Sequence, residues 1–373
     1  MKRAMKTLLK WPGGKGRELK FILPHIPASI ENYYEPFFGG GAVYFNLNTV
    51  KKSCYVNDMS DELMNFYLSI KEQNKTFFEH LDMLNHNWDL LTKLYINEVT
   101  KLALFYEDFY NGNKLELDLD DYINTISLNL SLKLEKNKLR KRILEIEINK
   151  SLINKFKRTK SLEIQKGRLP NEDLHNIFLS ALKSAYYTFI RKLYNNPSEF
   201  LVCKDEFSAI FLFIRTYCYS GMFRYNSMGK FNVPYGGIGY NNNSLKKKID
   251  YYSSPLLVKK FKNTYFESSD FEIFLSSKKL SSNDFIFLDP PYDTEFSTYD
   301  KNEFNRSDQV RLSNLLIKKV KAKWMLVIKS TDFILSLYEN KNLTISSVDK
   351  KYNVSFMNRN LRDVSHLIIR NYK

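Results

Sequence analysis

One stretch of the chain, residues 284–293 (DFIFLDPPYD), constrains the fold more than any other. Four apolar residues lead into an acid, two prolines and a tyrosine, which is typical of a buried parallel strand that ends in a rigid loop. The loop offers a carboxylate, two proline carbonyls and an aromatic face, from Asp289, Pro290, Pro291 and Tyr292. Together these groups suit a flat ring that carries an amino group.

The charge of the chain indicates a polyanionic partner. The 373 residues contain 57 Lys and Arg against 41 Asp and Glu, which gives a formal net charge of +16. Such a surplus favours nucleic acid over a membrane surface as the partner. A coding sequence rich in A and T, which favours Lys, Asn, Tyr and Phe, is an alternative explanation of the same composition.

Neither a metal site nor a membrane segment is indicated. The three cysteines, Cys54, Cys203 and Cys218, are far apart and form no CxxC pair. The most apolar run, residues 207–214, is too short to span a bilayer, and no apolar signal region precedes Trp11. We therefore expect a soluble, cytoplasmic protein that contains no metal.

Two earlier strands predict an α/β fold that binds a nucleotide-like ligand. Residues 32–38 predict a strand, which Gly39, Gly40 and Gly41 and a helix over residues 42–47 follow; this order brings ligands against a helix N-terminus. A second strand, residues 53–57, ends in Asp58, where doubly wound folds hold ribose hydroxyls. Alone, Asp58 could equally cap the following helix. Both features together favour an adenosine-type ligand.

The middle of the chain has a different character. Residues 131–168 hold thirteen Lys and Arg against four Glu, and apolar residues recur there at helical spacings. This pattern predicts a mainly helical insertion, either an antiparallel pair or a coiled hairpin. Its charge fits either a solvated face or a clamp on the DNA backbone, and the sequence leaves both interpretations open.

A second informative stretch is residues 219–236, YSGMFRYNSMGKFNVPYG. It mixes cationic and amide side chains with aromatic ones and is interrupted by glycines and a proline. Such a loop or hairpin can place polar groups on base edges and an apolar wedge into the base stack. A polar loop without a ligand is the alternative, which composition alone favours.

With these parts placed, the chain resembles the Dam-type DNA adenine-N6 methyltransferases (D12 class, alpha group). The resemblance covers about residues 1–90 and 200–370, and the DPPY and YSGMFRYN stretches are its most specific parts. It implies an α/β fold, a Rossmann-like class I methyltransferase sheet with an inserted, mainly helical target-recognition domain. The expected ranges are 1–60 and 262–373 for the catalytic cofactor-binding domain, and 61–261 for the recognition domain with its basic insertion at about 95–190.

The resemblance also implies roles for single residues. The expected contacts of the cofactor, S-adenosyl-L-methionine, are Trp11, Lys15, Glu35, Phe37, Gly39, Gly41, Asp58, Asp270, Phe271 and Asp289. The expected catalytic residues are Asp289, Pro290, Pro291 and Tyr292. The expected DNA contacts are Lys10, Ser220, Met222, Arg224, Asn226 and Pro234, with Arg224 reading a guanine. Lys329 and Ser330 depart from the pattern, because many members have Asn there.

These roles predict methylation of the exocyclic N6 of an adenine in double-stranded DNA. The adenine must flip out of the duplex, and Asp289 and the Pro290 carbonyl would accept the two N–H bonds of its amino group. The resemblance extends to members that methylate GATC and to restriction-modification pairs, so GATC and a cognate restriction endonuclease are further expectations. A catalytically silent DNA-binding protein of the same fold and an RNA adenine methyltransferase are the alternatives.

Overall fold

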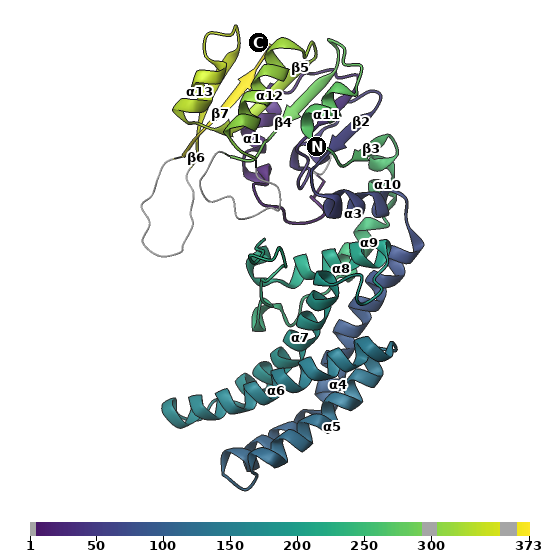
Figure 1. Cartoon of the computed structure of the whole chain (residues 1–373), viewed down its shortest axis with the longest axis vertical. Coiled ribbons are helices and arrows are strands. Elements are labelled where there is room, and N and C mark those ends of the chain that lie inside the picture. Colours follow the sequence, from purple (N-terminus) through teal and green to yellow (C-terminus); the bar gives the residue numbers. More distant parts are fainter. Residues whose placement is uncertain (1–4, 293–303, 351–363) are drawn as a thin grey trace. The chain divides into compact units, whose positions relative to one another are not determined.

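The computed structural model describes residues 5–292, 304–350 and 364–373. The chain divides into two compact units, the first formed by Met1–Lys71 and Ser254–Lys373 and the second by Glu72–Ser253. Figure 1 shows that the first unit contains the sheet and that the second is helical. The boundaries differ from those expected at residues 60 and 262, because the flanking helices α3 (Asp61–Lys71) and α10 (Pro255–Phe261) pack against a strand of the sheet unit.

The first unit is built on a seven-stranded sheet of order β3-β2-β1-β4-β5-β7-β6. Its strands are β1 (Tyr33–Glu35), β2 (Cys54–Asn57), β3 (Thr264–Glu267), β4 (Phe285–Leu288), β5 (Lys323–Lys329), β6 (Thr344–Lys350) and β7 (Val364–Arg370). The first five strands in this order are parallel, whereas β7 runs antiparallel to both β5 and β6. The strands predicted at residues 32–38, 53–57 and 284–293 are present as β1, β2 and β4.

The central strand β4 explains why this sheet forms. All four of its residues are buried, as a parallel strand covered on both faces requires. Its neighbours β1 and β5 come from distant parts of the chain, with Ile286 opposite Tyr34 on one side and Trp324 on the other. Asp284, just before the strand, accepts hydrogen bonds from the backbone and side chain of Asn32 (3.1 and 2.9 Å), which fixes the start of the strand beside β1.

Short helices cover the sheet. They are α1 (Leu19–Ile22), α2 (Ala42–Asn46), α3 (Asp61–Lys71), α10 (Pro255–Phe261), α11 (Phe271–Ser276), α12 (Arg306–Lys318) and α13 (Asp332–Tyr338). Apolar residues of α11, α12 and α13, among them Phe274, Leu315 and Ile334, form one core with alternate residues of β4 and β5. The helices thus cover the face of the sheet. The carboxyl ends of the parallel strands lead into the connecting loops, where α/β folds place their ligands.

The second unit consists of long helices. They are α4 (Lys75–Tyr110), α5 (Glu116–Leu134), α6 (Lys138–Lys166), α7 (Asn171–Asn195), α8 (Lys204–Tyr217) and α9 (Lys246–Tyr252). The predicted helical insertion is confirmed, as a series of packed helices in which α6 contacts both α5 and α7. Among the residues that the structure describes, no helix is both long and apolar enough to cross a membrane.

The amphipathic, helical pattern of residues 61 to about 94 predicts one helix, which the structure divides into two. Gln73 has a φ of +49°, which is unfavourable in a right-handed helix, so α3 ends at Lys71. The side chain of Asn74 then accepts a hydrogen bond from the Phe77 amide (3.0 Å) and starts α4 as an N-cap. The apolar periodicity continues across this break, and for that reason the sequence did not reveal it.

Candidate functional site

Three acids meet at one edge of the sheet. Glu35 ends β1, and Asp58 and Asp289 directly follow β2 and β4, which flank β1 in the same direction. The pKa of Glu35 is raised well above its ordinary value, because the side chain is buried and because Asp289 and Asp58 add negative charge nearby. Tyr33 donates a hydrogen bond to Glu35 (2.8 Å), which partly opposes this effect. The edge therefore favours a cationic ligand.

The glycine loop after β1 is fixed by this edge. Gly39 has a φ of +49°, and its amide donates to the Asp58 carboxylate (2.8 Å). A Cβ at Gly39 would lie 2.8 Å from Cδ1 of Trp11, so only glycine allows the indole against the loop. The other Asp58 oxygen accepts from the Ser60 amide (3.0 Å). Asp58 thus joins the glycine loop to the start of α3, although it is not the N-cap of the helix itself.

Lys15 connects the N-terminal loop to the DPPY loop. Its side chain is 3% exposed, and its Nζ forms an ion pair with Asp289, whose side chain is 17% exposed. The same Nζ donates to the hydroxyl of Tyr292 (2.9 Å) and to the carbonyl of Gly13 (3.1 Å). Residues more than 270 positions apart therefore share one polar network. We use the name strand-end site for this network and the two neighbouring acids, Glu35 and Asp58.

Two residues that sequence reasoning missed hold the DPPY loop. Nε2 of His366, on β7, lies 3.1 Å from the hydroxyl of Tyr292, and the two rings meet edge to face at 5.5 Å. Gln309, fully buried on α12, donates to the carbonyl of Pro291 (3.0 Å). Neither residue carries a local signal, because an isolated His or Gln in an apolar pattern is usually only part of the core.

The remaining cofactor candidates lie after β3. Asp270 caps α11 by accepting from the Glu272 amide (2.9 Å), and it also pairs with Arg311 (2.8 Å). The buried ring of Phe271 lies 5.5 Å from the ring of Phe37, so these two predicted contacts are neighbours.

The first unit also contains Lys10 and Lys329, which the sequence analysis singled out. Lys10, predicted to contact DNA, is exposed. Lys329, where the sequence departs from the family pattern, is directly opposite His366 in the β5–β7 pairing.

The 219–236 segment belongs to the second unit and adopts a hairpin-like loop. Antiparallel bridges join Cys218 to Tyr235 and Tyr225 to Phe231, without a regular strand ladder. Arg224 is exposed, and its Nε donates to the side chain of Asn232 (2.8 Å).

Other predicted DNA contacts partly shape this loop. The Asn226 side chain accepts from the amides of Met228 and Lys230 (3.0 and 2.9 Å), so it fixes the turn at the tip. Ser220 and Pro234 are exposed, and the Pro234 carbonyl accepts from the Tyr219 amide (2.9 Å). Met222 is half-buried.

Helices α7 and α8 hold the 219–236 segment through its backbone. Asn195 exchanges two hydrogen bonds with the backbone of Phe231 (both 2.9 Å), and Arg191 donates to the carbonyl of Val233 (2.8 Å). Arg215 is 5% exposed and donates to the carbonyls of Met222 (3.1 Å) and Gly221 (3.2 Å). Burial lowers the pKa of Arg215 to about 10. Sequence reasoning did not identify these supports, which lie on helices outside the motif.

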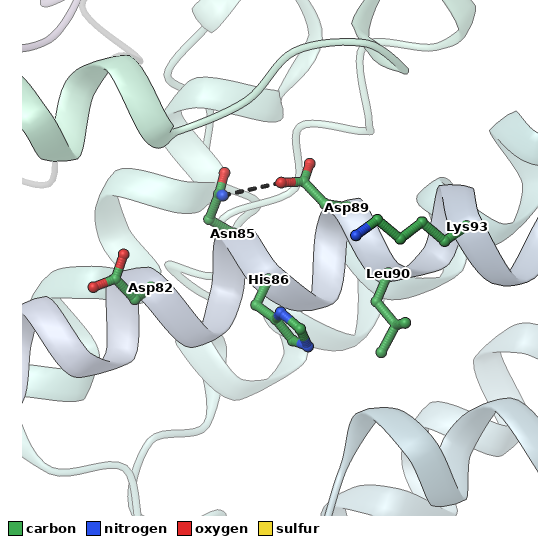
Figure 2. A pocket seen from close by; sticks show the side chains of 6 residues that line it. All are labelled: Asp82, Asn85, His86, Asp89, Leu90 and Lys93. Carbon is green, nitrogen blue, oxygen red and sulfur yellow. Dashed lines mark hydrogen bonds between the residues drawn. The ribbon is translucent and has the colours of Figure 1, made fainter.

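A pocket of about 320 Å³ lies along α4 in the second unit. Figure 2 shows the six residues that line it: Asp82, Asn85, His86, Asp89, Leu90 and Lys93. Asn85 donates to Asp89 (3.1 Å) and accepts from the Ser244 hydroxyl (3.0 Å) and the Leu245 amide (2.8 Å). The polar atoms of Asn85 thus join α4 to the segment before α9. No residue of the strand-end site lines this pocket.

One cluster in the second unit resembles a metal site. The ligand atoms of His80, Cys203 and Glu206 lie within 4.8 Å of one another. However, both oxygens of Glu206 accept hydrogen bonds from Arg140 (2.6 and 3.1 Å). The guanidinium already compensates the charge that a metal ion would need, so we interpret this cluster as a buried ion pair.

The fold and the strand-end site together define a class of protein. A largely parallel seven-stranded sheet with a reversed β7, a glycine loop after β1 and acids at the strand ends forms a Rossmann-like methyltransferase fold. The model of the D12 class N6 adenine-specific DNA methyltransferase family matches residues 11–171 and 130–354. The chain belongs to this family of DNA-modifying enzymes, which confirms the resemblance seen in the sequence.

Two known relatives extend over almost the whole chain, and a third covers about half of it. The type II methyltransferase M.CviBI of Paramecium bursaria Chlorella virus NC1A is 25% identical over 99% of this chain and 100% of its own length. The type II methyltransferase M.MjaIII of Methanocaldococcus jannaschii is also 25% identical, over 99% of each chain. The retron Ec67 DNA adenine methylase of Escherichia coli is 29% identical over 53% of this chain and 65% of its own.

Proposed function

We propose that this protein transfers a methyl group from S-adenosyl-L-methionine to the exocyclic N6 of a flipped adenine in duplex DNA. The observation that carries the proposal is the Lys15–Asp289–Tyr292 network, because it brings the N-terminal loop and the DPPY loop to the strand edge that Glu35 and Asp58 share. An amino-bearing ring and a cationic donor both suit this edge.

The residues present fit the cofactor. It supplies an electrophilic methyl group on a positively charged sulfur, and an edge with three acids against the one paired cation Lys15 suits such a charge. Gly39 leaves open the space that a Cβ would take beside Trp11, and half-exposed Asp58 offers a carboxylate for ribose hydroxyls. We propose that these residues hold the cofactor together with Lys15, Glu35, Phe37, Gly41, Asp270, Phe271 and Asp289.

The DPPY loop would prepare the adenine amino group. Its nitrogen is a poor nucleophile because the lone pair is delocalised into the ring. Hydrogen bonds from this group to Asp289 and to the Pro290 carbonyl would localise the lone pair and aim it at the donor. The nitrogen loses one proton in the reaction, and the Asp289 carboxylate would accept it.

Other contacts would keep this geometry rigid. Gln309 fixes the Pro291 carbonyl, and Lys15 and His366 hold the hydroxyl of Tyr292. The Tyr292 ring would stack on the extruded base, which is worth about 1–3 kcal/mol by comparison with other base–aromatic contacts.

Target choice would depend on the 219–236 segment. Arg224 is exposed on this loop, and a guanidinium suits the O6 and N7 acceptors of a guanine. We propose GATC as the target sequence, on the strength of the YSGMFRYN motif alone. The names of two relatives, both type II methyltransferases, support a cognate restriction endonuclease as a partner.

Labelled-methyl transfer from S-adenosyl-L-methionine to duplex DNA and duplex RNA tests this function. We expect label only in N6-methyladenine of DNA, and we expect Asp289→Asn to lower turnover more than about a hundredfold. Glu31→Gln, an acid near the amino end of β1, is the matched control and should retain wild-type turnover. Sequencing around the methylated adenines then identifies the target.

Three results would contradict the proposal. Absence of transfer by the wild type would indicate a silent DNA-binding protein, and label in RNA alone would indicate an RNA enzyme. Near-normal turnover of Asp289→Asn would remove Asp289 from the reaction.

A further inference from the structure

Asn232 holds the side chain of Arg224 across the hairpin-like loop of the 219–236 segment. Nε of Arg224 donates to Oδ1 of Asn232 (2.8 Å), and Nη2 donates to the Asn232 carbonyl in a longer contact (3.4 Å). The Asn232 amide in turn donates to the carbonyl of Arg224 (3.1 Å). Three hydrogen bonds therefore join the two residues, and two of them involve the guanidinium.

These bonds use one edge of the guanidinium and leave another edge open. Nε and Nη2 form the side edge of this planar group, whereas Nη1 and Nη2 form its end. Nη1 forms no hydrogen bond with any described residue, and the Arg224 side chain is exposed. The end of the guanidinium therefore keeps two parallel N–H groups, which match the O6 and N7 acceptors of a guanine.

The backbone that carries Asn232 is firmly held. Its two neighbours, Phe231 and Val233, are 1% and 0% exposed, and hydrogen bonds with α7 fix the backbone of both. Burial alternates along residues 231–235, with Asn232 and Pro234 on the more exposed side. The Oδ1 acceptor of Asn232 thus has a buried, packed support behind it.

An amide oxygen suits the support of a cation that reads a base. An exposed arginine samples many rotamers, and ordering it on binding costs free energy. Asn232 restricts this freedom before DNA arrives, and it does so without a formal negative charge. Within the described part of the chain no carboxylate pairs with Arg224, so its positive charge stays available to DNA.

We infer that Asn232 is a positioning residue for target recognition, which presents the end of the Arg224 guanidinium to a guanine in the major groove. The inference rests on the proposed function in taking Arg224 as the reader of a guanine. It adds the residue that orients this reader and the edge that the reader uses. A positioned end should sharpen the preference for guanine at one base pair, because a displaced guanidinium meets only one of the two acceptors.

Binding of a randomised duplex DNA library tests this inference without requiring methylation. The sequences of the bound duplexes give the preference for guanine over the other bases at each position. The variants are Asn232→Ala, Arg224→Ala and the double variant. The matched control is Asn129→Ala, because Asn129 is an exposed asparagine on α5. Circular dichroism verifies that all four proteins remain helical.

We expect Arg224→Ala to lose the preference for guanine at one position. Asn232→Ala should reduce the preference at that same position by about 2- to 10-fold, the cost of ordering one flexible side chain. The double variant should match Arg224→Ala, because a residue that acts only through Arg224 has no effect once Arg224 is removed. Asn129→Ala should keep the wild-type preference at every position.

Asn232→Asp separates positioning from a direct contact of the Asn232 Nδ2 group with DNA. Aspartate keeps the Oδ1 acceptor, so this variant should retain the preference for guanine. Its added negative charge should weaken binding to all sequences alike. Loss of the preference in Asn232→Asp as well as in Asn232→Ala would overturn the inference.

Other outcomes would also overturn it. A wild-type preference in Asn232→Ala would show that Asn232 does not position Arg224, and an additive double variant would make Asn232 an independent contact. If Arg224→Ala keeps the preference for guanine, the reading by Arg224 and the inference fail together. Absent methylation with the expected library result removes only the catalytic proposal.

Discussion

Each unit of this protein buries a lysine, and the surroundings of the two lysines differ. In the strand-end site, Lys15 is 3% exposed and pairs with the carboxylate of Asp289. In the helical unit, Lys183 is 1% exposed and donates to the carbonyl of Trp88, whose ring centroid lies 4.2 Å from its Nζ. Burial lowers the pKa of Lys183 to about 7, although Asp89 opposes the shift.

The comparison shows two uses of buried polar groups. Polar side chains from several distant segments converge on one another at the strand ends, which is the arrangement expected of a catalytic site. In the helical unit, buried Arg215 and half-buried Asn195 mainly satisfy backbone atoms, and Arg224 is left exposed. The proposed chemistry thus lies in a largely buried network, and the proposed DNA recognition lies on an exposed loop that helices support through its backbone.

The largest effect should come from removing the buried cation of the strand-end site. Lys15→Met takes the counter-charge from a largely buried carboxylate, so we expect a loss of about 3–5 kcal/mol in the free energy of unfolding. Lys52→Met is the control, because its pair with Glu31 has exposed fractions of 61% and 37% and should contribute less than about 1 kcal/mol. Urea unfolding measures both variants. Equal losses in the free energy of unfolding would show that the buried Lys15 pair contributes no more than the exposed Lys52 pair.

A smaller and more selective effect should come from exposed Arg224 in the helical unit. Arg224→Ala should reduce discrimination at one base pair by ~1–3 kcal/mol, since a bidentate contact to guanine has this value. Methylation kinetics on the target and on single-base variants measure the change. An equal loss on every sequence would instead make Arg224 a phosphate contact.

The pH dependence of stability should separate Lys183 from an exposed lysine. Unfolded chains keep this proton up to a pKa near 10.5, whereas the folded state loses it near 7. Between these values the unfolded state binds more protons, so the contribution of Lys183 to stability rises with pH, by up to about 1.4 kcal/mol per pH unit. Unfolding at pH 7.5, 8.5 and 9.5 should show this slope in the wild type and in the exposed control Lys75→Met, but not in Lys183→Met. Equal slopes in all three would contradict it.

The smallest effect concerns the contact between Tyr292 and His366. A double-mutant cycle with Tyr292→Phe and His366→Leu should give a coupling of about 0.5–1.5 kcal/mol in the free energy of unfolding, the net value of one hydrogen bond. Tyr33→Phe replaces Tyr292→Phe in a control cycle, because Tyr33 bonds to Glu35. Strict additivity of the first cycle would mean that His366 does not support Tyr292.

Much of the site could be found from short stretches of sequence. The glycine loop, Asp58 and the DPPY motif each follow a strand, and parallel strands bring their carboxyl ends to one edge. That rule is enough to bring Gly39 and Asp58 together, which are nineteen residues apart. The YSGMFRYN motif also located the 219–236 segment, whose backbone geometry depends on its own glycines and on Asn226.

The supports of the site could not be found in this way. His366 approaches Tyr292 only because β7 returns antiparallel to β5, and no local pattern predicts which strand a returning hairpin joins. Gln309 and Arg215 are buried polar residues on helices whose buried faces are mainly apolar. The break at Gln73 was missed because one residue with a positive φ leaves the helical periodicity intact.

The sequence by itself determined the strands, the residue types at their ends and the family, since each depends on contiguous residues or on a motif of fixed spacing. Tertiary structure alone decided that Lys15 neutralises Asp289, that His366 and Gln309 brace the DPPY loop, and that Glu147 of α6 is buried and paired with Lys192 of α7. The physical reason is that burial and charge pairing depend on neighbours in space, which the chain brings together only when the sheet and the helices pack.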